Sequence, residues 1–121
     1  MKHHIECIPT DDHLYLRIGG IWLRENARDI IKEISNFSEQ NPGLPLLIDV
    51  CDMKSDVSTF NDFDDVHIFI EMHFRKLGRI AVIDRDNRKK HNEFFETAAN
   101  NRGLRIRFFY TDRQEALSWL L

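Results

Sequence analysis

The sequence has few of the residues that staple or interrupt a small protein. Of its 121 residues, 2 are cysteine, 3 proline and 5 glycine. Cys7 and Cys51 form no Cys-x-x-Cys motif, so no disulfide framework or zinc knuckle is indicated, and a chain of this length can bury enough surface to fold without one. No apolar run is long enough to cross a membrane, and no signal region follows Met1. We therefore expect one cytoplasmic domain spanning residues 1–121, with no membrane span.

The sequence also lacks a large excess of positive or negative charge. The formal net charge is −3, with 31% charged and 42% hydrophobic residues, as in an ordinary globular domain. This balance argues against a cationic nucleic-acid binder. No glycine-rich phosphate loop is present, and the six histidines lack the spacing of a metal site. We expect no nucleic-acid partner, no cofactor and no bound metal.

Hydrophobic periodicity divides the chain into strands and helices. Residues 3–7 and 14–18 alternate apolar and polar side chains about a turn, which predicts an antiparallel hairpin. Short apolar runs at 44–50 and 80–83 predict parallel strands buried on both faces. The other expected elements are helices from about 27 to 40, 59–76 and 87–101, a strand at 104–110, and a last helix behind a Thr111–Gln114 capping box. The fold class is therefore α/β, with a mostly parallel five-stranded sheet, an N-terminal antiparallel hairpin and about four helices.

This order of elements resembles the STAS domain of anti-sigma-factor antagonists, and more closely the uncharacterised SpoIIAA-like branch. The residues that carry the resemblance are LYLRIGG at 14–20, LLID at 46–49, RIAVID at 79–84, FFY at 108–110 and EALSWL at 115–120. The resemblance covers essentially the whole chain. It implies a SpoIIAA-like fold and a non-catalytic module that acts through a regulatory protein partner.

The resemblance also implies a candidate phosphorylation site. In phospho-regulated members, an Asp ends the third strand, and a serine at the start of the next helix is phosphorylated by a partner kinase. Counting forward from Asp49 places Ser58 and Thr59 at this position. Both residue types are also preferred helix N-caps, so a purely structural role is the alternative.

Acidic residues close two of the expected central strands. Asp49 and Asp52 follow one apolar run, and Asp84 and Asp86 follow the other. Ligands of open α/β sheets bind at the carboxyl ends of strands, where carboxylates can hold magnesium. The competing hypothesis is therefore a metal-dependent phosphoryl-transfer enzyme, although short acids at such ends also form turns and caps.

The second helix shows more apolar surface than one sheet can cover. Ile68, Phe69 and Met72 form a stripe separate from the stripe that contains Ile70 and Phe74. This stripe has three alternative partners: a neighbouring helix, a second subunit, or a small lipophilic ligand. We expect a binding module that forms a homodimer, with Ile68, Phe69 and Met72 as interface or ligand contacts.

Overall fold

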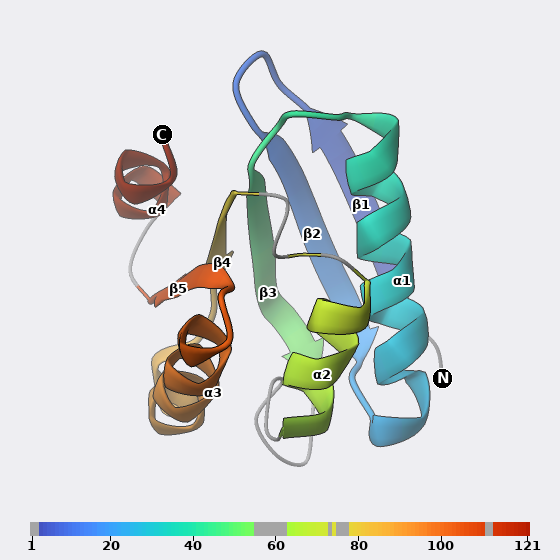
Figure 1. Cartoon of the computed structure of the whole chain (residues 1–121), viewed down its shortest axis with the longest axis vertical. Helices are drawn as coiled ribbons and strands as arrows, with labels where there is room; N and C mark the ends of the chain where they lie inside the picture. Colours follow the sequence, from blue (N-terminus) through green and yellow to red (C-terminus); the bar gives the residue numbers. More distant parts are fainter. Residues whose placement is uncertain (1–2, 55–62, 73, 75–77, 111–112) are drawn as a thin grey trace.

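The computed structural model describes residues 3–54, 63–72, 74, 78–110 and 113–121 (Figure 1). They form a five-stranded sheet with strand order β1-β2-β3-β4-β5. The strands are β1 (His3–Pro9), β2 (Leu14–Ile21), β3 (Leu46–Lys54), β4 (Arg79–Ile83) and β5 (Arg105–Phe109). The helices are α1 (Arg24–Gln40), α2 (Phe63–Glu71), α3 (Lys89–Asn101), α4 (Arg113–Leu120) and the short 3₁₀ helix η2 (Asp86–Arg88).

Pairing within the sheet is mixed. β1 and β2 are antiparallel, whereas the pairs β2–β3, β3–β4 and β4–β5 are parallel. The carboxyl ends of β2 to β5 therefore meet at one edge of the sheet, which gathers the segments that follow β3 and β4. This confirms the predicted fold class and the N-terminal hairpin.

Helices cover both faces of the sheet, but unequally (Figure 1). Alternate residues of β2, such as Leu14 and Leu16, point into a large core that α1, α2 and α3 cover. On the opposite face, Leu47, Ala81 and Phe109 form a second cluster beneath α4. The central strands β3 and β4 are thus buried on both faces, which explains why they read as continuous apolar runs. Within the described residues, no helix is long and apolar enough to span a membrane.

Several element boundaries differ from those expected. β3 continues to Lys54, past the end of its apolar run, because it pairs with the last residues of β2 beyond a register shift. α2 ends at Glu71, not at residue 76. The helix expected over 87–101 is divided into η2 and α3. Thr111, the first residue of the expected capping box, lies outside the described residues.

The prediction that α2 carries an uncovered apolar stripe is wrong for two of its three residues. Phe69 is 0% exposed and Ile68 is 8% exposed, and both lie in the main core. The Phe69 ring packs edge-on against Phe74, with centroids 4.8 Å apart, and against Phe95 of α3 at 5.9 Å. Met72 is half-buried against the same core. Since α1 and α3 both pack on α2, the neighbouring-helix alternative holds, and this stripe is not a free interface.

Candidate functional site

A buried polar cluster lies where β4 ends. The Asp84 carboxylate is 1% exposed and accepts hydrogen bonds from Arg88 Nη1 at 2.8 Å and Asn92 Nδ2 at 2.9 Å. The backbone N–H of Arg85 donates to the same carboxylate at 2.7 Å. The strand places Asp84, and the helical spacing of η2 and α3 returns Arg88 and Asn92 to it four and eight residues later. Both carboxylate oxygens are therefore occupied within the chain.

Arg88 connects this cluster to the neighbouring strand. Its guanidinium donates to the carbonyl oxygens of Val50, at 3.3 Å, and Met53 of β3. Arg85 adds a bond from Nε to the Cys51 carbonyl oxygen at 2.6 Å. The side chains that follow β4 thus bind the backbone of β3 near its end. Asp84, which the sequence suggested as a ligand for magnesium, instead holds Arg88, and Arg88 joins the end of β4 to β3.

Burial governs the ionisation of this region. It raises the pKa of Asp84 above the ordinary 3.8, although Asn92, the Arg85 N–H and the Arg88 charge all act in the opposite direction. Burial likewise raises the pKa of Tyr110 to about 12, so its phenol stays neutral at physiological pH. Sequence analysis missed Arg88, Asn92 and Tyr110. For Arg88 and Asn92, the signal in the sequence was the four-residue spacing of Asp84, Arg88 and Asn92.

The other acids of β3 and of the segment after β4 have surroundings that differ from those of Asp84. Asp49 accepts hydrogen bonds from the Tyr15 hydroxyl at 3.2 Å and from the backbone N–H of Cys51 at 3.0 Å. Asp52 forms an exposed ion pair with Arg17 at 2.7 Å. Asp86 is exposed and lines a pocket. In the described part of the chain, no three His, Cys, Asp or Glu side chains are grouped as metal ligands.

The candidate phospho-acceptors Ser58 and Thr59 lie outside the described residues. They belong to the segment between the end of β3 at Lys54 and the start of α2 at Phe63. Their assignment remains a prediction from the sequence.

Cys51 lies in the same region, in the second half of β3. Its thiol is near the Ile83 carbonyl oxygen, 3.8 Å away, and burial with the nearby charge of Asp49 raises its pKa from 9.0 to about 12. The thiolate, which is the reactive form, is therefore about a thousandfold scarcer at pH 8 than for an unperturbed thiol. We expect iodoacetamide to modify Cys51 very slowly in the folded protein, as followed by peptide mass spectrometry.

The urea-unfolded protein is the control, because both cysteines should then react at ordinary rates. A Cys7→Ser variant isolates the Cys51 signal. Rapid modification of Cys51 in that folded variant would contradict an inert, structural thiol.

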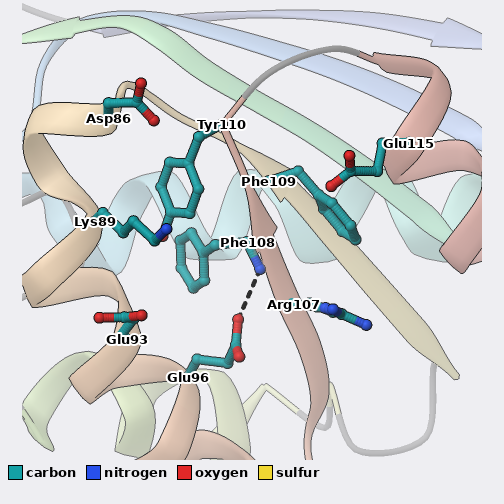
Figure 2. Close-up of a pocket in the computed structure, with 9 residues that line it drawn as sticks. All are labelled: Asp86, Lys89, Glu93, Glu96, Arg107, Phe108, Phe109, Tyr110 and Glu115. Carbon is teal, nitrogen blue, oxygen red and sulfur yellow. Dashed lines mark hydrogen bonds between the residues drawn. The ribbon is translucent and has the colours of Figure 1, made fainter.

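A pocket of 340 Å³ lies between α3, the outer strand β5 and α4 (Figure 2). Its lining is mostly charged: Asp86, Glu93, Glu96 and Glu115 supply carboxylates, and Lys89 and Arg107 supply positive charge. The two cations also lie near aromatic rings. Lys89 Nζ is 5.6 Å from the Tyr110 ring centroid, and the Arg107 guanidinium carbon is 5.5 Å from that of Phe109. Such a lining suits polar or charged groups better than a lipophilic ligand.

No known family model matches the sequence, and no curated protein matches it either. Solved structures do resemble the fold. An anti-sigma factor antagonist from Mycobacterium paratuberculosis superposes with a TM-score of 0.64 at 15% identity, over 98% of this chain and 94% of that one. An uncharacterised DUF3478 protein from Shewanella loihica PV-4, described as SpoIIAA-like in fold, gives 0.62 at 21% identity, with the same coverage.

The anti-sigma factor antagonist SpoIIAA in its unphosphorylated form is a third similar structure. Its TM-score is 0.59 at 14% identity, and the match covers 98% of this chain and 95% of SpoIIAA. Each of the three comparisons spans nearly the full length of both chains, so the similarity concerns the whole architecture and not a single motif. Together with the mixed sheet and the helices of the described residues, they show that the chain has a SpoIIAA-like fold.

Proposed function

We propose that this protein is a non-catalytic regulatory module that acts by binding another protein. The fold supports this proposal, because two of the similar structures are anti-sigma factor antagonists. The observation that carries it is the state of Asp84. This carboxylate, which a catalytic role would need to be available, is 1% exposed and bonded to Arg88 and Asn92.

The same geometry argues against the competing phosphoryl-transfer hypothesis. A magnesium ion bound by Asp84 would have to displace Arg88, which itself holds the carbonyl oxygens of Val50 and Met53. Asp49 is also engaged, by Tyr15 and by the Cys51 N–H. The carboxylates of Asp84 and Asp49 therefore already have partners within the fold. An enzyme would instead show magnesium-dependent turnover of phosphorylated substrates that Asp49→Asn and Asp84→Asn abolish.

A protein partner is better supported than a small lipophilic ligand. Ile68 and Phe69, which the sequence suggested as contacts for such a ligand, are buried in the core. The described pocket is lined mainly by carboxylates and bases. Native mass spectrometry of the purified protein should accordingly show no co-purified lipid.

Phosphorylation is the proposed regulation of this binding. A phosphate on Ser58 or Thr59, just before α2, would add up to two negative charges to a segment that already contains Asp56 and Asp62. Added charge of this size at a contact surface repels an acidic partner and changes the docking of any partner. We propose Ser58 or Thr59 as the acceptor.

Incubation with ATP and an anti-sigma-type serine kinase tests both parts of the proposal. We expect the kinase to bind the protein without ATP, as measured by calorimetry, and to add one phosphate that peptide mass spectrometry places on Ser58 or Thr59. We expect the phosphorylated protein to bind about tenfold more weakly, a loss of about 1.4 kcal/mol.

The Ser58→Ala/Thr59→Val double variant should bind normally and accept no phosphate. Ser118→Ala, which changes an exposed serine of α4, is the matched control and should behave as wild type. Phosphate on other residues only would remove the proposed switch. Absence of binding to every such kinase tested would contradict the proposed function itself.

A further inference from the structure

The two outer strands of the sheet, β1 and β5, differ in whether other residues bond to the backbone groups along their free edges. On β5, the bond from the Asp84 N–H to the Phe109 carbonyl oxygen, 3.0 Å, shows that Phe109 directs its backbone groups toward the β4 side. Backbone groups alternate in direction along a parallel strand, so those of Ile106 and Phe108 point outward. These are the groups that an added strand would use.

Two side chains of α3 already occupy this outward edge. Glu96 Oε1 accepts the Phe108 N–H at 2.8 Å, as Figure 2 shows, and Asn100 Nδ2 donates to the Ile106 carbonyl oxygen at 2.9 Å. Glu96 and Asn100 lie one helical turn apart, and they imitate the acceptor and the donor of a neighbouring strand. Native sheets protect their edges by devices of this kind. The β5 edge is therefore closed to strand addition.

The β1 edge has no such protection from the described residues. Leu14 of β2 donates its N–H to Pro45, on the β3 side, at 2.9 Å, so the alternating residues Tyr15 and Arg17 direct their backbone groups toward β1. Their partners on β1 are Ile8 and Glu6. The backbone N–H and C=O groups of the intervening Ile5 and Cys7 must then point outward. No side-chain hydrogen bond within the described residues reaches those groups.

We propose that two copies of this chain join their β1 strands, antiparallel and across a twofold axis, into one continuous sheet. The occupant of the open edge is a second copy because identical strands can satisfy each other's outward groups. The closed β5 edge limits the assembly. With only one edge open per chain, addition stops at two subunits, whereas two open edges would allow a fibre.

Charge on β1 selects the register of this pair. When Ile5 lies opposite Ile5 of the second copy, Glu6 lies opposite His4 of the second copy, and the symmetry repeats this contact. In the next register that keeps outward groups paired, Glu6 would lie opposite Glu6, and like charges directly opposite are destabilising. The first register also places two Ile5 side chains together beside the core against which each already packs. The twofold axis therefore passes between the Ile5 residues.

Engineered disulfides test the pair and its register. In a Cys7→Ser/Cys51→Ser background, we introduce His4→Cys and Glu6→Cys together. These positions form a non-hydrogen-bonded pair across the proposed seam, where Cα atoms are about 4.5 Å apart and a disulfide fits. Mild oxidation should give a covalent dimer on a non-reducing gel.

A single variant discriminates between the registers. Glu6→Cys alone should not cross-link in the same background, since Glu6 does not face its own copy. Efficient cross-linking of this single variant would overturn the proposed register, and absence of cross-linking in the double variant would overturn the dimer.

Mass in solution, by light scattering, gives a second test without new cysteines. Wild type should have twice the chain mass of 14.4 kDa. Cys7→Pro removes an outward N–H that β2 does not use, so it should keep its circular dichroism spectrum and become monomeric. Glu96→Ala/Asn100→Ala opens the β5 edge and should form assemblies larger than two. A monomeric wild type would overturn the proposal, and a Glu96→Ala/Asn100→Ala variant that stays dimeric would overturn the role of α3 in closing that edge.

Discussion

Replacing Arg88 with methionine is expected to lower the free energy of unfolding by about 3–5 kcal/mol, the typical cost of leaving a buried charge without its partner. Asp84 would keep the Asn92 amide and the Arg85 N–H but lose its ion pair. The carbonyl oxygens of Val50 and Met53 would lose a donor as well. Urea denaturation at neutral pH, followed by circular dichroism, measures the loss.

The pH dependence of this loss has a definite sign. The pKa of Asp84 is raised in the folded protein, so the fold binds this proton more tightly than the unfolded chain, whose carboxyl has the ordinary 3.8. Ionisation therefore destabilises the fold as pH rises from 3.8 through the folded pKa. Without Arg88 the pKa rises further, and the penalty grows. The unfolding free energies of wild type and variant should converge at acid pH and separate toward neutrality.

A double variant separates the contribution of the Asp84–Arg88 ion pair to the free energy of unfolding from the cost of leaving Asp84 unpaired. Asp84→Asn combined with Arg88→Met removes both charges, and it should cost less than Arg88→Met alone because no buried charge is left unpaired. Equal losses in the single and double variants, or a loss independent of pH, would show that Arg88 stabilises the fold only through its other contacts.

Phe69→Ala is expected to cost about 3–5 kcal/mol, because it removes a fully buried ring and leaves a cavity among Phe74 and Phe95. A folded domain of ordinary stability has only about 5–15 kcal/mol in total. The variant should therefore unfold at much lower urea concentration. The mass of the folded protein in solution, which reports its oligomeric state, should not change, since Phe69 is not at a surface.

Phe94→Ala is the matched control for this experiment. Phe94 lies on α3 and is 52% exposed, so the same change of side chain should cost less than about 1 kcal/mol. If Phe69→Ala were as mild as Phe94→Ala and instead altered the mass in solution, α2 would be an interface after all.

The candidate site shows the limits of reading a sequence one segment at a time. The apolar runs were long enough to identify β3 and β4, and Asp84 does follow the end of β4. Asp49 and Asp52, which were expected to close their strand, lie inside β3, because β3 continues to Lys54. The partners of these acids could not be identified in this way. Arg88 and Asn92 look like solvated helix residues until η2 and α3 place them over the end of β4.

The sequence by itself determined the order of elements, the antiparallel hairpin and the mostly parallel sheet, because the period of apolar side chains is a local property of the chain. Only the tertiary structure decided what those side chains face. Ile68 and Phe69 belong to the core because α1 and α3 pack on α2. The β5 edge is closed because α3 places Glu96 and Asn100 beside it. The burial of Ile68 and Phe69 and the hydrogen bonds at the β5 edge depend on residues that are distant in sequence, so no local pattern encodes them.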